Sequence, residues 1–245
     1  MHPFDPVFCL IVSAGVFAGA VVSGLVGFAF SAVAGVVLLQ VLQPTEAVPL
    51  MMACSIITQG VSLVALRGTV QWRGSPLLIT GGALGIVPAL YLLHTIDARI
   101  LRAGFGAFLA AYAAYLLVRP AVARVRGVPG RFRHALVGFG GGLIGGLTAM
   151  PGALPTIWCE LRGMPKDDQR GLVQPYIAAM QLLALVLMLS HNALSSRMLL
   201  NLALSLPALA AGAAIGIMMF RRIGDGLFRH VVLALLLVSG LTFVL

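Results

Sequence analysis

Long apolar runs occupy most of this 245-residue chain, and only short polar stretches separate them. A transmembrane helix needs about 20 consecutive apolar residues, and a helix satisfies all of its backbone hydrogen bonds inside lipid. Only 9% of the residues are charged, whereas a soluble domain carries about 25%. The runs therefore predict an all-α integral membrane protein that crosses the cell (inner or plasma) membrane several times and has no sizeable aqueous domain.

Charged residues, glycines and prolines divide the chain into ten expected helical segments. They are 7–26, 28–42, 47–66, 75–93, 100–118, 134–149, 152–161, 172–190, 198–220 and 227–245. Most are long enough to span a bilayer, but 28–42 and 152–161 are too short for a core of about 30 Å at about 1.5 Å per residue. The sequence leaves open whether these two segments are re-entrant or cross fully.

The two short segments hold the same place, second of five, in each half of the chain. We therefore expect a first transmembrane repeat at 1–118, a basic cytoplasmic linker at 119–133 and a second transmembrane repeat at 134–245. Each repeat should contain a broken or short hairpin helix plus three full transmembrane helices. Similar glycine spacings and similar loop motifs recur in the same order in both halves.

The positions of the basic residues predict the orientation of the helices. If the linker is cytoplasmic and each short segment forms a hairpin with the preceding one, 13 of the 16 lysines and arginines lie inside and three lie outside. Such a bias is typical of real topologies. The same arrangement gives the two halves opposite orientations, which predicts an inverted repeat. The basic excess thus needs no nucleic acid as a partner.

The two breaks are the predicted substrate site. In many secondary transporters with inverted repeats, broken helices meet near the membrane midplane, and their N-termini attract anions through free N–H groups and helix dipoles. Glycines would admit an anion close to the backbone, and hydroxyl and amide groups would add donors. The predicted site residues are Ser23, Gly24, Gly27, Phe28, Ser31, Gln59, Thr148, Met150, Pro151, Gly152, Thr156 and Gln181.

Simpler roles exist for several of these residues. Glycines before the breaks can serve close helix packing, and this is the favoured interpretation for them individually. The Pro151-Gly152 step is costly inside an apolar run unless it lines a cavity, so there we favour a functional role. Gln59 and Gln181 could equally donate hydrogen bonds to a neighbouring helix.

The remaining polar residues argue against enzymatic chemistry. All seven carboxylates lie at expected segment ends or loops. Glu160 is expected to pair with Arg162 or Arg170, and Tyr176 is expected to anchor at the membrane interface. We find no metal-ligand cluster, no catalytic motif and no cofactor signature, so we expect no enzyme, no metal and no cofactor.

The second break also carries a family resemblance. Residues 138–158 hold a glycine-rich stretch, a proline break and a short apolar run, and residues 161–170 form a Gly-x-Pro loop that ends in arginine. This order resembles the second-half signature of the sulfite exporter TauE/SafE family. Two features depart from the family pattern: Met150-Pro151-Gly152 replaces the commoner Gly-Gly-Pro order, and Phe28 and Phe30 stand where glycines are common.

The resemblance implies a membrane transporter of small sulfur-containing or organic anions, such as sulfite, sulfoacetate or related sulfonates. Its expected partners are the small anionic substrate and the lipid bilayer, and a homodimer is left open. The alternative is a non-transporting membrane subunit that scaffolds a larger complex. The short loops disfavour this alternative because they offer little contact surface.

Overall fold

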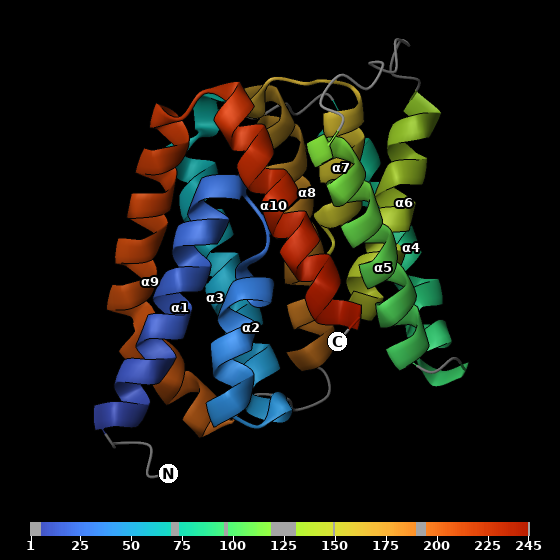
Figure 1. Ribbon diagram of the computed structural model, residues 1–245. Coiled ribbons are helices and arrows are strands. Elements are labelled where there is room, and N and C mark those ends of the chain that lie inside the picture. The colour runs from blue at the N-terminus through green and yellow to red at the C-terminus, as the bar shows by residue number, and fades with distance from the viewer. Residues whose placement is uncertain are drawn as a thin grey trace. The chain divides into compact units, whose positions relative to one another are not determined.

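Helices make up nearly all of the computed structural model (Figure 1), which describes residues 6–69, 74–95, 98–118, 131–148, 150–189 and 195–244. Within these ranges there are ten α-helices, one short 3-10 helix and no strand. The α-helices are α1 (Pro6–Val26), α2 (Phe30–Val41), α3 (Pro44–Ala65), α4 (Ser75–Thr95), α5 (Ala98–Val118), α6 (Arg131–Thr148), α7 (Ala153–Leu161), α8 (Lys166–Leu189), α9 (Ser196–Arg222) and α10 (Asp225–Val244). The 3-10 helix covers Arg67–Thr69.

These helices confirm the predicted all-α membrane architecture. Among the described residues, five stretches are long and apolar enough to cross a membrane; they lie in α1, α3, α8, α9 and α10. The two segments expected to be short are indeed short, since α2 has 12 residues and α7 has nine. The chain is therefore a multi-pass membrane protein.

The chain forms two compact units that do not follow the two halves of the sequence. Unit 1 comprises Met1–Arg67 and Gln181–Arg222, and unit 2 comprises Gly68–Met180 and Ile223–Leu245. Each unit thus takes helices from both expected repeats. Of the predicted linker 119–133, residues 119–130 lie outside the described part, and the last three residues begin α6.

Unit 1 is built around α1, which packs against α9, α2 and α3. Glycines make the contact with α9 close: a Cβ added to Gly216 would lie 2.2 Å from the carbonyl oxygen of Val21. The core of the unit is formed by apolar side chains of α1, α2 and α3, among them Val16, Leu38 and Leu50, each fully buried. Small residues at such a contact allow the two backbones to approach.

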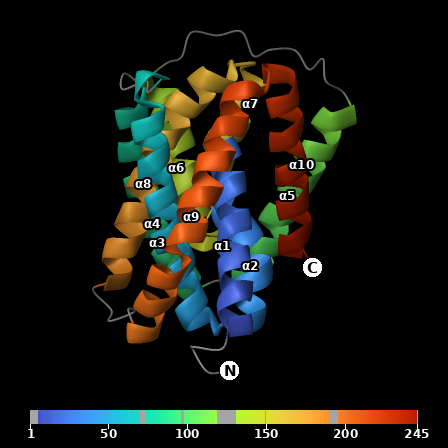
Figure 2. The same ribbon diagram turned by 90° about the vertical axis from the view of Figure 1, so that its left-hand side faces the viewer.

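Unit 2 places α4 against α6 and α10 against α5; Figure 2 shows α10 beside α5 from a second side. The contact between α4 and α6 is again made by glycines, because a Cβ on Gly142 would lie 2.0 Å from the carbonyl oxygen of Gly82. The short helix α7 packs on α6.

One packing relation recurs in the two units. In unit 1 the first helix of the first half (α1) pairs with the fourth helix of the second half (α9). In unit 2 the first helix of the second half (α6) pairs with the fourth helix of the first half (α4). Two similar halves that exchange helices in this way would produce such pairs, although the inversion of the repeats stays a prediction.

Candidate functional site

The first break separates α1 from α2 and lies inside unit 1. Gly27 has φ 88° and Ala29 has φ 68°, so the backbone turns through left-handed conformations that glycine adopts freely and alanine rarely does. The Gly27 N–H donates to the Ser23 carbonyl oxygen at 2.8 Å, which closes the end of α1. Phe28, Ala29 and Phe30 are all buried. The left-handed turn therefore stops the helix in a buried location.

The N-terminus of α2 begins directly after this turn. The first hydrogen bond of its ladder runs from the Val33 N–H to the Ala29 carbonyl oxygen at 3.2 Å. The N–H groups of Phe30, Ser31 and Ala32 precede that bond. The N-cap residue is Ala29, whose side chain has no acceptor for them. Backbone donors and the positive end of the helix dipole thus lie together at the tip.

Two predicted polar residues, Ser23 and Gln59, adjoin this break. The Gln59 Nε2 group on α3 donates to the Gly27 carbonyl oxygen at 3.0 Å, and Gln59 is fully buried. Ser23 is also fully buried, and its hydroxyl has no hydrogen-bond partner among the described residues. The structure therefore brings Ser23, Gly27 and Gln59 together, with Gln59 fixing the turn and Ser23 holding an unused hydroxyl.

Gln181 lies in unit 1 as well, although it belongs to the second half of the sequence. Its Nε2 group donates to the Ser55 hydroxyl at 2.7 Å, while its buried Oε1 atom has no partner among the described residues. Ser55 and Gln59 are four residues apart on α3 and therefore share one helix face. Gln181 thus contacts the face of α3 that carries Gln59. Ser55 was not among the predicted site residues, since only its polarity marked it in the sequence.

The second break separates α6 from α7 and lies inside unit 2. Met150, Pro151 and Gly152 are buried. Two hydrogen bonds shape the turn: Ala153 N–H donates to the Met150 carbonyl oxygen at 3.3 Å, and Thr156 N–H donates to that of Gly152 at 3.0 Å. Gly152 has φ −76°, a conformation open to any residue, so the backbone at this position does not require glycine.

The remaining predicted residues of the breaks are located as follows. Phe28 forms part of the buried turn, Ser31 is half-buried in the first turn of α2, and Thr156 is buried in α7. Thr148 ends α6, but its side chain lies outside the described residues. Gly24 faces α9, since an added Cβ would lie 2.8 Å from the Ala213 carbonyl oxygen.

Glycines of α6 make room for the second break and for one aromatic ring. A Cβ on Gly145 would lie 2.7 Å from the Pro151 Cα, and one on Gly141 would lie 2.6 Å from the Tyr176 hydroxyl. Tyr176 is fully buried, and its hydroxyl donates to the Gly138 carbonyl oxygen at 3.1 Å. The expected interfacial anchor is therefore wrong for Tyr176, because the glycine face of α6 accepts the ring inside unit 2.

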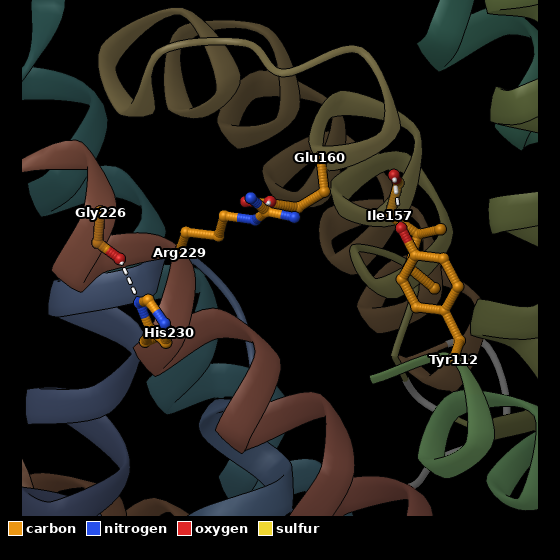
Figure 3. Close-up of polar contacts among 6 residues, drawn as sticks. All are labelled: Tyr112, Ile157, Glu160, Gly226, Arg229 and His230. Carbon is orange, nitrogen blue, oxygen red and sulfur yellow. Dashed lines mark hydrogen bonds and ion pairs between the residues drawn. The ribbon is translucent and has the colours of Figure 1, made fainter. Parts of the chain in front are cut away.

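Two side-chain contacts attach α7 to other helices of unit 2 (Figure 3). The Tyr112 hydroxyl on α5 donates to the Ile157 carbonyl oxygen at 3.4 Å, and Arg229 on α10 forms an ion pair with Glu160 at 3.3 Å. Glu160 is only 6% exposed in its side chain, against 32% for Arg229. Together with α6, these contacts hold the short helix from three sides.

The expected partners of Glu160 are wrong. The Arg162 guanidinium carbon lies 5.9 Å from the centroid of the Trp158 ring, and the Arg170 Nε group donates to the Gln174 Oε1 atom at 3.0 Å. Glu160 pairs instead with Arg229, which follows it by many residues in sequence. Only the packing of α10 in unit 2 brings these two side chains together.

The chemistry of both breaks favours an anion over a cation or a covalent reaction. Each short helix begins in a buried turn. The first turn of α2 presents three backbone N–H groups and that of α7 presents one, at Leu154, and the polar side chains in these first turns are the hydroxyls of Ser31 and Thr156. In the described residues no group of His, Cys, Asp and Glu side chains could hold a metal ion. A multi-pass helical protein with a broken helix in each unit has the features of a secondary transporter.

Comparison with known proteins agrees with this class. The model of the protein family described as "Sulfite exporter TauE/SafE" matches residues 11–243, nearly the whole chain. The chain therefore belongs to the TauE/SafE family, a family of sulfite-type membrane exporters, and the predicted resemblance is confirmed. No curated protein and no solved structure matches the chain.

Proposed function

We propose that the protein exports small sulfur-containing or organic anions, such as sulfite, sulfoacetate or related sulfonates, across the cell membrane, and that its two breaks bind the substrate. The observation that carries this proposal is the buried N-terminus of α2, with the N–H groups of Phe30, Ser31 and Ala32 ahead of the first helical hydrogen bond. Helix N-termini of this kind are ready-made anion sites.

The first break offers the richer set of donors. The Ser23 hydroxyl is buried without a partner among the described residues, and Ser31 lies in the first turn of α2. A substrate oxyanion would accept hydrogen bonds from these hydroxyls and from the backbone. Charge-assisted bonds of this type are roughly twice as strong as bonds between neutral groups.

The second break offers fewer backbone donors. The N–H groups of Ala153 and Thr156 already donate to carbonyl oxygens, and Pro155 has no N–H group. Leu154 contributes the remaining N–H group of the first turn. We therefore expect the first break to bind an anion more strongly than the second.

The proposed substrates are anions, and no carboxylate belongs to the proposed binding residues. An inside-negative membrane potential favours outward movement of an anion by about 2.3 kcal/mol per charge per 100 mV. Export would then proceed without a coupled ion.

Flux into proteoliposomes tests the proposal. Purified protein should move sulfite or a small sulfonate faster than empty vesicles do, and the rate should rise when the potential favours anion movement. Transport no faster than that of empty vesicles across this panel would refute the proposed function.

Matched glycine variants test the binding residues. Gly152→Leu fills buried space at the second break, whereas Gly104→Leu adds the same side chain at an exposed position of α5 with nothing within 4 Å of an added Cβ. We expect Gly152→Leu to abolish transport in protein that still elutes as a single species in detergent, and Gly104→Leu to retain it. Wild-type rates for Gly152→Leu would remove the second break from the site.

A further inference from the structure

Unit 1 contains a cavity far from its break. It has a volume of about 220 Å³ and is lined by residues from the start of α1, the end of α2 and the beginnings of α3 and α9: Phe8, Val41, Leu42, Gln43, Glu46, Arg197 and Asn201. Phe8 and Ser23 are 15 residues apart on α1, so about 22 Å of helix separates the cavity from the first break. The cavity is therefore distinct from the proposed substrate site.

Asn201 is the buried polar group of this cavity. The residue is only 4% exposed and lines the cavity from the second turn of α9. Its side-chain amide carries both N–H donors and a carbonyl acceptor, so it can hydrogen-bond to either end of a polar ligand in the cavity.

Two side chains of opposite charge line the same space. Glu46 lies in the first turn of α3 and Arg197 in the first turn of α9. The ion pair found among the described residues joins Arg229 and Glu160, so Glu46 and Arg197 are not paired with each other. A purely anionic ligand would meet Glu46, and a purely cationic one would meet Arg197.

The cavity also limits the size of its ligand. Its volume lies just below the roughly 300 to 1,000 Å³ of common ligand pockets, yet it far exceeds the space that one water needs. Phe8, Val41 and Leu42 supply an apolar wall. A small metabolite with a short carbon chain fits these dimensions better than a nucleotide or a peptide.

We propose that this cavity is a second ligand site, which binds a small zwitterion of the amino-acid class. The acidic group accepts hydrogen bonds from Arg197 and from the Asn201 amide, and the ammonium group lies near Glu46. The orientation predicted from the loop charges places this site at the outer ends of the helices.

Binding to the purified full-length protein in detergent tests the site. The probes are glycine, β-alanine and 4-aminobutyrate, which differ in the distance between their charges, and the controls are propionate and propylamine, which each lack one charged group. We expect at least one zwitterion to bind at least tenfold more tightly than both controls in isothermal titration calorimetry. If all three bind no more tightly than propionate and propylamine, the proposal is refuted.

Variants of Glu46 and Arg197 test which charged group of the ligand lies near which side chain. Glu46→Gln should reduce the preference for the zwitterion over propionate at least fivefold, and Arg197→Gln should reduce the preference over propylamine by a similar factor. Asn201→Leu should weaken zwitterion binding at least tenfold. Arg222→Gln, at the exposed far end of α9, is the matched control and should bind as the wild type does.

Two results would contradict the assignment even if a zwitterion binds. One is that both Glu46→Gln and Arg197→Gln keep the wild-type preference for the zwitterion over the controls. Both variants should fold, because Glu46 is half-buried and Arg197 is exposed. The other is full zwitterion binding to folded Asn201→Leu. The outcome is independent of the flux assay, so the second site can fail while anion export stands.

Discussion

The Glu160–Arg229 pair gives the sharpest prediction about what holds the short helix α7 in place. Removing the cation should destabilise the protein more than removing the anion does. The reason is their unequal burial: the Glu160 side chain is 6% exposed and that of Arg229 is 32% exposed. After Arg229→Gln, a buried carboxylate remains without its cation. After Glu160→Gln, the long arginine side chain can turn its head toward water.

The size of each effect follows from the geometry. Two unit charges 3.3 Å apart attract by about 5 kcal/mol at an effective dielectric constant of about 20. Desolvation offsets most of this attraction, so the intact pair contributes little net stability. Loss of one partner of a buried pair costs about 3 to 5 kcal/mol. We therefore expect about 3 kcal/mol for Arg229→Gln and about 1 kcal/mol for Glu160→Gln.

A double-mutant cycle measures these values. The free energy of unfolding is obtained for the wild type, both single variants and the double variant by titrating the detergent-solubilised protein with denaturing detergent. The double variant should be more stable than Arg229→Gln alone, because it no longer contains the unpaired carboxylate. Arg222→Gln, an exposed change on α9, is the control and should change stability by less than about 0.5 kcal/mol.

Two outcomes would refute this reasoning. If Glu160→Gln costs as much as Arg229→Gln, unequal burial does not control the effect. If the two single effects add without coupling in the double variant, the ion pair does not connect α7 to α10 in the folded protein.

Three further predictions concern packing and the first break. Tyr176→Phe removes the donor to the Gly138 carbonyl oxygen and should lower the free energy of unfolding by about 1 kcal/mol, with the near-ultraviolet circular dichroism spectrum preserved. Gly142→Ala places a Cβ 2.0 Å from the Gly82 carbonyl oxygen, so the yield of folded protein on size exclusion should fall sharply, whereas Gly60→Ala, which meets nothing within 4 Å, should leave it unchanged. Gln59→Leu removes the 3.0 Å hydrogen bond to the Gly27 carbonyl oxygen and should lower both the free energy of unfolding, by about 1 to 3 kcal/mol, and the transport rate in proteoliposomes.

The helical elements were predictable from local sequence because the bilayer restricts the choice so strongly. Apolar length alone identifies a membrane helix, and the predicted runs 28–42 and 152–161 are too short to span a bilayer alone; the observed helices there have 12 and nine residues. The observed helices accordingly begin and end close to the expected boundaries. The compact units were not predictable in this way. They depend on which helices pack together. Helix α1 packs against α2 and α3 of its own half and also against α9 of the other half.

The same holds for the predicted site residues: local sequence predicts some of their features, and helix packing determines the others. The left-handed turn at Gly27 is a local property, and a glycine at that point of an apolar run indicates it. The ion pair of Glu160 with Arg229 and the hydrogen bond of Gln181 to Ser55 are tertiary properties. Loop spacing pointed Glu160 to the wrong arginines because its partner lies on α10, far along the same half of the chain, and only helix packing brings the two side chains together.

Glycine illustrates why residue type alone did not separate binding from packing. Gly24, Gly27 and Gly152 are all predicted site residues, yet the first faces the backbone of α9, the second has φ 88°, and the third has an ordinary right-handed conformation in a buried turn. The first two are different reasons for lacking a side chain, a close helix contact and a left-handed turn, whereas the backbone at Gly152 does not require glycine. Gly24 contacts the backbone of α9, so substitutions there should act through stability, whereas Gly152 directly precedes α7 in the proposed site, so we expect substitutions there to act through transport.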